Sequence, residues 1–134
     1  YKLRVYYEDT DAGGVVYYAN YLKFLERART EALILLGFSN KKIKEDFGSL
    51  IVVKSCSIEY KIPAHLEDDL CIRSFIKSIT KTSFFMNQFI SRGEDIIVEA
   101  KVHLVFVNNE GKPMKIPETL FQDFKPYFCD TIKV

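Results

Sequence analysis

The feature that most constrains the fold is a nearly continuous run of strand-like sequence that begins near residue 50. Four blocks, at residues 50–60, 70–80, 83–91 and 96–107, are rich in β-branched and aromatic residues. The links between them carry proline, glycine or asparagine, which are typical turn residues. Strands joined by short links pair in the antiparallel sense, because a parallel pair needs a crossover of about a dozen residues or more. The sequence therefore predicts an antiparallel sheet.

The block at 96–107 shows the clearest alternation of apolar and polar residues. On one face we expect Ile96, Val98, Ala100, Val102, Leu104 and Phe106, and on the other Glu99, Lys101 and His103. We predict that the apolar face packs on the core and that His103 is a surface or interface residue.

A helical pattern precedes these strands. Between residues 19 and 36, apolar side chains recur at steps of three and four, at Tyr21, Leu25, Ala28, Ala32 and Leu35. Gly37 is a typical residue to end a helix. Residues 2–8 predict a further strand, and residues 40–47 form a short polar segment. One long helix with an antiparallel sheet of about five strands is an α+β architecture.

The size of the chain and the length of its strands bear on its assembly. With 134 residues and no repeat or linker, residues 1–134 are predicted to form a single domain. The predicted strands have about ten residues, whereas strands usually have about five or six. One helix covers only part of one face of such a sheet. We therefore predict a homodimer, in which a second copy covers the remaining apolar surface.

Charge and hydropathy exclude several classes of protein. The chain has 19 basic and 18 acidic residues, which argues against a nucleic-acid-binding protein, because such proteins usually have a basic excess. No apolar stretch approaches the roughly 18 residues of a membrane span. No apolar signal region follows Tyr1, so we expect a cytoplasmic protein. Because the chain does not begin with Met, we expect it to be trimmed.

The cysteines and histidines do not form a recognisable metal or nucleophile motif. Cys56, Cys71 and Cys129 are odd in number and lack CxxC spacing, so we expect reduced thiols of a cytosolic protein. No Cys and His cluster has zinc-ligand spacing, and no metal is predicted. His65 is interpreted as a loop residue. No serine lies in a nucleophile-elbow sequence.

The turn at residues 9–14, with sequence DTDAGG, is the place where chemistry is most plausible. A calcium-binding EF-hand loop is excluded, because its fifth position would be Gly13 and its twelfth Asn20 instead of Glu. Two interpretations stay open. The residues suit a plain tight turn. Alternatively, Asp11 is a catalytic base or nucleophile beside the free N–H groups of a helix start.

The sequence around this turn resembles a known family. Residues 6–21, YYEDTDAGGVVYYANY, and residues 24–31, FLERARTE, are similar to the hotdog-fold acyl-CoA thioesterases. More narrowly they resemble the YbgC type, associated with the bacterial Tol–Pal system, within the 4-hydroxybenzoyl-CoA thioesterase family. Weaker similarity extends to residues 58–64 and 80–83.

The resemblance implies a fold, an assembly and an activity. The implied fold is one long helix wrapped by a curved antiparallel sheet, in dimers or dimer-of-dimers tetramers with active sites at the subunit interface. The implied reaction is hydrolysis of an acyl-CoA to free acid and CoA, without metal or cofactor, since CoA is part of the substrate.

The resemblance also implies roles for individual residues. Asp11, unlike Asp9, matches the catalytic carboxylate. The backbone N–H of Tyr18 matches the group that polarises the thioester carbonyl, although many YbgC-type sequences have His there. The implied contacts with substrate are Gly14, Val15, Lys61, Lys81 and Ser83, of which the last three are candidates for the CoA phosphates. The resemblance implies a helix start nearer Tyr18, whereas capping preference alone places it at Asn20.

Other functions remain to be distinguished. The alternative to an enzyme is a non-catalytic module that binds acyl-CoA or acyl carrier protein. A ligand-sensing transcription factor would need a DNA-binding segment that these residues do not contain. The aromatic cluster at residues 84–86 is expected to contribute both to the core and to the lining of an acyl tunnel.

Overall fold

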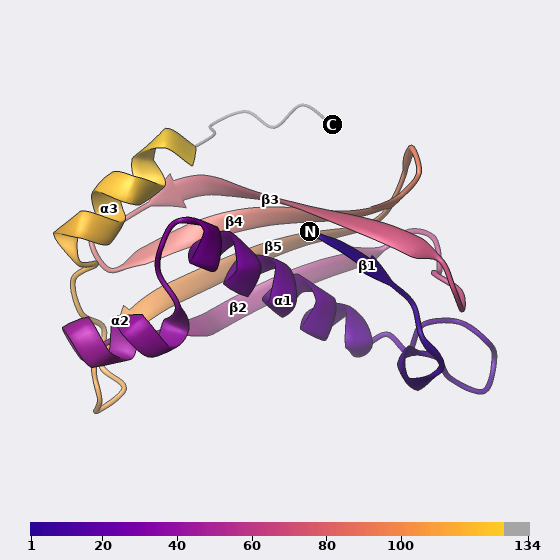
Figure 1. Cartoon of the computed structure of the whole chain (residues 1–134), viewed down its shortest axis with the longest axis horizontal. Helices are drawn as coiled ribbons and strands as arrows, with labels where there is room; N and C mark the ends of the chain where they lie inside the picture. The colour runs from indigo at the N-terminus through magenta and orange to yellow at the C-terminus, as the bar shows by residue number, and fades with distance from the viewer. Residues whose placement is uncertain (128–134) are drawn as a thin grey trace.

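The computed structural model of the chain describes residues 1–127, so the prediction for Cys129 lies outside the described residues. Within them the strands form one five-stranded sheet with the order β1-β3-β4-β5-β2. All neighbouring pairs are antiparallel. The strands are β1 (Lys2–Arg4), β2 (Leu50–Tyr60), β3 (Asp69–Ile79), β4 (Ser83–Arg92) and β5 (Asp95–Val107). The helix α1 (Asn20–Leu35) crosses one face of the curved sheet at an angle (Figure 1). The predicted α+β architecture is confirmed.

The strand predicted at residues 2–8 is wrong in its second half. Of the predicted strand, only Lys2–Arg4 (β1) pairs with β3, and the chain then enters a short 3₁₀ helix at Tyr7–Asp9. The carboxylate of Asp9 accepts a hydrogen bond of 2.9 Å from the backbone N–H of Tyr6. Because Asp9 is buried, this bond holds the chain in a turn at the point where the strand would otherwise continue.

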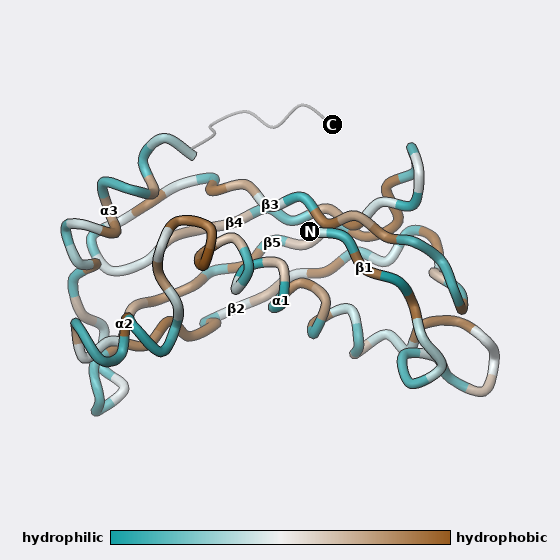
Figure 2. Tube along the Cα trace, viewed as in Figure 1, coloured by the Kyte–Doolittle hydropathy of each residue, from teal (hydrophilic) through white to brown (hydrophobic). Residues whose placement is uncertain are grey.

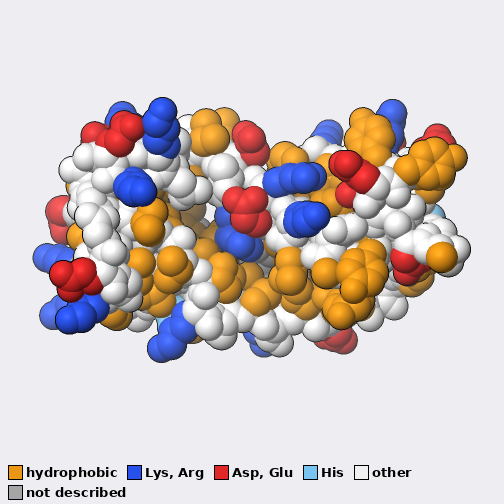
Figure 3. Space-filling view, turned by 90° about the horizontal axis from the view of Figure 1, so that it is seen from below, with side chains coloured by type: hydrophobic (Ala, Val, Ile, Leu, Met, Phe, Trp, Pro, Cys, Tyr) orange, Lys and Arg blue, Asp and Glu red, His pale blue; other side chains and the backbone are white. Residues whose placement is uncertain are grey.

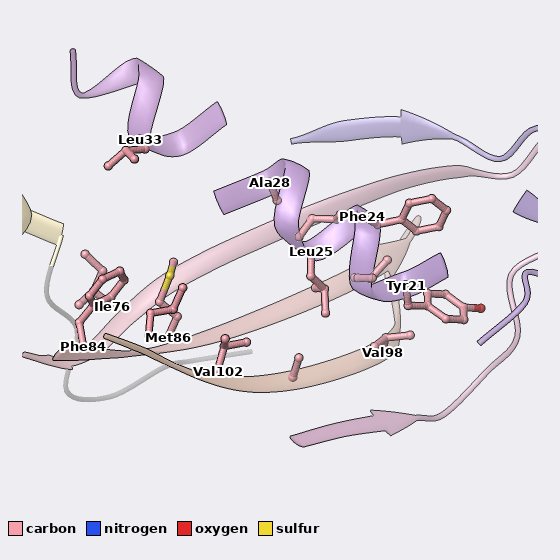
Figure 4. Close-up of a cluster of buried hydrophobic side chains, with 14 of the residues drawn as sticks. Tyr21, Phe24, Leu25, Ala28, Leu33, Ile76, Phe84, Met86, Val98 and Val102 are labelled. Atoms are coloured by element: carbon pink, nitrogen blue, oxygen red, sulfur yellow. The ribbon is translucent and has the colours of Figure 1, made fainter. Parts of the chain in front are cut away.

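The four long strands begin and end within one residue of their predicted bounds. Hydrophobic and hydrophilic residues alternate along them, so that one face packs against α1 (Figure 2). Figure 4 shows the resulting core, in which Tyr21, Leu25 and Ala28 of α1 face Val98 and Val102 of β5. The alternation that the sequence shows in β5 therefore positions α1 on the sheet.

The predicted buried face of α1 is correct at its start and wrong at its end. Leu35 is 87% exposed, whereas Leu33 is buried. Leu33 and Leu35 are two positions apart, which corresponds to about 200° around the axis of an α-helix, so the two side chains point to nearly opposite sides. The helix crosses a curved sheet obliquely, and the side that meets the sheet therefore drifts around the helix along its length (Figure 1).

Two further helices cover the end of the sheet that lies away from β1. The polar segment 40–47 is the helix α2 (Asn40–Phe47), whose first turn is capped by Ser39, with the hydroxyl oxygen accepting from the N–H of Lys42 at 3.0 Å. The helix α3 (Glu118–Phe124) was not predicted. It buries Leu120 and Phe124, and the Phe124 ring lies 5.4 Å from that of Phe84.

The strand β2 is an edge of the sheet. In the described chain it pairs with β5 alone. Val52 and Val53 near its start are 40% and 48% exposed. An edge strand of this length with exposed apolar side chains is a site at which another strand can add.

None of the described helices is long and apolar enough to cross a membrane.

Candidate functional site

The turn that the sequence singled out is the tip of a small hairpin between β1 and α1. Thr10 forms a bridge with Val16, and the N–H of Asp11 donates to the carbonyl of Val15 at 2.9 Å. The N–H of Gly14 donates to the carbonyl of Asp11 at 3.1 Å, and Gly14 has a φ of 80°, which favours glycine. The hairpin therefore presents Asp11 at its tip.

The carboxylate of Asp11 is exposed but oriented. Its Oδ1 accepts a hydrogen bond of 2.8 Å from the N–H of Gly13. No other hydrogen bond or ion pair to this carboxylate is found in residues 1–127. Asp9, in contrast, is buried and bonded to the backbone of Tyr6. The structure thus places the two aspartates differently, with Asp9 holding the turn and Asp11 exposed at the tip of the hairpin.

The base of the hairpin is tied to the start of α1. The carbonyl of Asp9 accepts hydrogen bonds of 2.9 Å from the N–H of Tyr17 and from the side-chain amide of Asn20. The helix begins at Asn20, so the start nearer Tyr18 is wrong, but Asn20 does not cap it: the N-cap position is Ala19, with no side-chain cap hydrogen bond. Tyr18 and Ala19 lie in the preceding turn, which is closed by the N–H of Asn20 on the carbonyl of Tyr17 at 2.8 Å.

The amides in this turn are available to a ligand. In the described part of the chain, the N–H groups of Tyr18 and Ala19 have no hydrogen-bond acceptor. They lie at the N-terminal end of α1, where the helix dipole places partial positive charge. A group that gains negative charge would be stabilised here.

Four tyrosines form a wall beside the helix start. The Tyr18 ring lies 4.9 Å from that of Tyr17 and 6.4 Å from that of Tyr60, which ends β2. The Tyr60 hydroxyl donates to the carbonyl of Tyr18 at 3.3 Å, and the Tyr21 ring is 5.4 Å from Tyr60. Burial raises the pKa of Tyr60 and of Tyr21, so both hydroxyls stay protonated at neutral pH.

A segment from the link between β2 and β3 completes the site. The N–H of Val16 donates to the carbonyl of Ala64 at 2.8 Å, and Val15 forms a bridge with His65. The N–H of Ala64 in turn donates to the Tyr21 hydroxyl at 3.0 Å. His65, interpreted from the sequence as a loop residue, lies beside the Asp11 hairpin, a proximity that no local pattern could predict because some fifty residues separate the two segments.

An ion pair fixes this segment. The Arg92 guanidinium is 2.7 Å from the Asp68 carboxylate and also donates to the carbonyl of Pro63 at 3.1 Å. Burial alone would raise the pKa of Asp68, but the hydrogen bond from the His65 N–H and the Arg92 charge together lower it. The side chain of His65 is exposed, with its Nδ1 3.9 Å from the same carboxylate.

The residues proposed as catalytic or substrate-binding do not all lie at this end of the molecule. Asp11, Gly14, Val15 and Tyr18 are together, and Lys61 follows Tyr60 and forms an ion pair of 2.9 Å with Glu99. The turn between β3 and β4, with Lys81 and Ser83, lies at the opposite end of the sheet (Figure 1). There Ser83 is buried, with its hydroxyl 2.8 Å from that of Thr80.

His103, Cys56 and Cys71, which were considered in the sequence as possible functional residues, lie away from this site. His103 stacks on Phe85 with 3.9 Å between ring centres, and its Nε2 is buried without a hydrogen-bond partner in the described chain. Cys56 and Cys71 are free thiols. In residues 1–127 no group of three or more His, Cys, Asp or Glu is arranged to hold a metal ion.

Comparisons with known proteins agree on one family. The family described as the Thioesterase-like superfamily matches residues 5–124. The acyl-CoA thioester hydrolase YbgC of Escherichia coli O6:H1 is 42% identical over 127 residues, with 93% of this chain and 94% of the relative covered. The acyl-CoA thioesterase YbgC of Helicobacter pylori strain 26695 is 42% identical over 132 residues, with 91% and 96% covered.

Solved structures extend this likeness to three dimensions. The crystal structure described as "Probable Thioesterase from Bartonella henselae" superposes with a TM-score of 0.85 at 39% identity, covering 87% of this chain and 97% of that one. BH1999 gentisyl-coenzyme A thioesterase gives a TM-score of 0.85 at 27% identity, covering 92% and 98%.

Proposed function

The chain belongs to the Thioesterase-like superfamily, with the hotdog fold, and from this premise we propose that it hydrolyses acyl-CoA thioesters to a free acid and CoA. The observation that carries the proposal is the exposed position of the Asp11 carboxylate at the tip of its hairpin. Its carboxylate is held by one hydrogen bond from Gly13, is exposed, and projects from a hairpin that is tied to the N-terminal end of α1. A carboxylate and free N–H groups on neighbouring segments are the two elements that thioester hydrolysis needs.

In the proposed reaction, the N–H groups of Tyr18 and Ala19 stabilise the thioester oxygen as it becomes negative. One such donor contributes about 3–4 kcal/mol to the transition state in enzymes where it has been removed. This role needs only backbone N–H, so tyrosine at position 18 serves as well as histidine. The tyrosine wall formed by Tyr17, Tyr18, Tyr21 and Tyr60 flanks the carbonyl and limits the approach of water.

Asp11 can act in the reaction in either of two ways, as a base or as a nucleophile. As a base it takes a proton from water while the water oxygen bonds to the carbonyl carbon; the carbon–sulfur bond then breaks, and the CoA thiolate takes the proton. As a nucleophile it bonds to the carbonyl carbon and expels the thiolate; water then cleaves the resulting anhydride. Neither route uses a metal or a cofactor other than the CoA of the substrate.

We further propose that two copies pair along β2. The pairing would join two sheets through an edge of eleven residues and cover Val52 and Val53. With such a pairing, Lys81 could serve a site on the other subunit, since it lies far from Asp11 in its own chain, whereas a contact of the buried Ser83 with substrate stays a prediction. A dimer of dimers, an acyl carrier protein as donor of the acyl group, and a cytoplasmic location stay predictions. Light scattering at micromolar concentration should give at least a dimer, and a monomer would refute the pairing.

The activity is tested with a panel of acyl-CoAs and a reagent that detects free thiol. We expect thiol to be released at a rate proportional to enzyme, with a preference for some acyl groups. The competing function is a module that binds acyl-CoA or acyl carrier protein without cleaving it. Saturable binding of an acyl-CoA without release of thiol would establish that module and refute the enzyme.

A further inference from the structure

A second feature of the molecule is a cavity beneath the C-terminal half of α1. Its volume is about 170 Å³, and its walls are mainly apolar side chains from α1, the sheet and α3: Leu33, Ile51, Ile76, Phe84, Met86 and Phe124. Figure 4 shows Leu33 of α1 on one side and Ile76, Phe84 and Met86 on the other. Apolar cavities of about 150 Å³ stay dry and take up benzene, so this one suits a group of about six carbons.

One wall of this cavity is polar. Glu26, Arg29 and Thr30 of α1 line it. The face in Figure 3 is hollowed near its middle, with basic and acidic side chains at the hollow and hydrophobic ones around it. The cavity therefore combines an apolar interior with charge on one side, which is the arrangement that binds an amphiphilic small molecule.

The guanidinium of Arg29 is held in place by a buried amide. Its Nη1 donates to the Oε1 of Gln88 at 2.9 Å. Gln88 is fully buried, and its Nε2 donates to the carbonyl of Leu25 at 3.1 Å and to the hydroxyl of Ser74 at 2.9 Å. These bonds leave Gln88 only its oxygen to offer, so Arg29 is fixed at the cavity wall.

The charge of Arg29 is not neutralised within the described chain. No carboxylate of residues 1–127 lies within ion-pair distance of it. The carboxylate of Glu26, one turn away, instead accepts from the Thr30 hydroxyl at 2.7 Å. Burial lowers the pKa of Arg29, and Glu26 acts in the opposite direction. A guanidinium has five N–H donors in a fork that fits a carboxylate, and Gln88 engages one nitrogen of that fork.

We infer that this cavity binds a free monocarboxylic acid, with its carboxylate on Arg29 and an unbranched tail of about six carbons between Leu33, Met86 and Phe124. The inference goes beyond the proposed function, because it needs neither CoA nor Asp11. Glu26 opposes an anion in this position. Replacing Glu26 with an uncharged residue is therefore expected to strengthen binding of the acid. At a purely apolar site, the same replacement would leave the affinity unchanged.

The two methionines of the chain give a direct readout. Met86 lines the cavity and Met114 does not. With ¹³C-methyl methionine, heptanoate should shift the Met86 resonance saturably and leave that of Met114 unchanged. Heptan-1-ol, which has a similar tail and no charge, should bind at least about tenfold more weakly, because a charge-assisted hydrogen bond is roughly twice as strong as a neutral one.

Variants separate the charge from the shape of the cavity. Arg29→Gln should weaken heptanoate at least about tenfold, whereas Arg27→Gln, on the exposed side of the same helix, should leave its affinity unchanged. Glu26→Gln should tighten it several-fold. The inference would be overturned if heptanoate failed to shift the Met86 resonance, or if heptan-1-ol bound with equal affinity. Both measurements use the wild-type protein, so they decide the matter even if Arg29→Gln does not fold. These titrations contain no thioester, so they succeed or fail independently of the hydrolase activity.

Discussion

The amide of Gln88 holds α1 to the sheet, and its replacement tests how much that contact contributes to stability. Gln88→Leu keeps a similar volume but removes three hydrogen bonds, one of them from the Arg29 guanidinium. A hydrogen bond to a charged group contributes about 1.5–3 kcal/mol and a neutral one about 1 kcal/mol. Burying leucine in place of an amide returns part of this loss. We therefore expect the free energy of unfolding to fall by about 2–3 kcal/mol.

The assay is equilibrium unfolding in urea at one fixed protein concentration, because subunit association would make stability depend on concentration. With a slope of about 1–3 kcal/mol/M, the expected midpoint falls by about 0.7–3 M. Gln122→Leu, at an exposed position of α3, is the matched control and should change stability by no more than about 0.5 kcal/mol.

A double-mutant cycle decides whether the Arg29 contact is the cause. Arg29→Met alone leaves the Gln88 oxygen unpaired, but in the double variant neither partner is left alone. The two changes together should therefore cost at least about 1 kcal/mol less than their sum. The reasoning is refuted if Gln88→Leu costs less than about 0.5 kcal/mol, or if the cycle is additive within about 0.3 kcal/mol.

Two further predictions concern local stability. Ser39→Ala removes the cap on the N–H of Lys42 and should lower the free energy of unfolding by about 1 kcal/mol in urea titrations; an unchanged midpoint would show that the cap contributes nothing. Asp68 has a lowered folded pKa, so its contribution is present above its unfolded value, near about 4, and is lost as the pH falls through the folded one. Asp68→Asn should thus be less stable than wild type at pH 7 in thermal unfolding, and the difference should shrink below about pH 4; a difference that is constant with pH would contradict this.

Much of the fold could be predicted because its signals are local. The strands from residue 50 to residue 107 are marked by their own β-branched and alternating residues and by turn residues between them. The start of α1 was predicted at Asn20, but not for the right reason, because Ala19 and not Asn20 holds the N-cap position. The burial of Leu33 in place of Leu35 could not be predicted, since it depends on the angle at which α1 crosses the sheet. The helix α3 was missed, although Pro117 and the spacing of Leu120 and Phe124 carry a weak helical signal.

The functional residues divide in the same way, into those that a local pattern marks and those that only the folded chain brings together. Asp11 and Tyr18 could be proposed because one short segment carries both and because that segment resembles a family. The approach of His65 to the hairpin, and the contact of Arg29 with Gln88, join residues about fifty and 59 positions apart. No spacing within the sequence reports such pairs. For the same reason, the sequence could not tell that Lys81 and Ser83 lie at the end of the sheet opposite to Asp11.

The proposed hydrolase activity depends most on Asp11, and the turnover of the Asp11→Asn variant tests it most directly. Asparagine keeps the acceptor oxygen that binds the Gly13 N–H but cannot act as a base or a nucleophile. Asp46→Asn, at an exposed position of α2, is the matched control. We predict that Asp11→Asn lowers kcat for the best acyl-CoA at least about a hundredfold, with the same urea midpoint and oligomeric state as the control. Thiol release by Asp11→Asn at nearly the rate of Asp46→Asn would contradict the central claim.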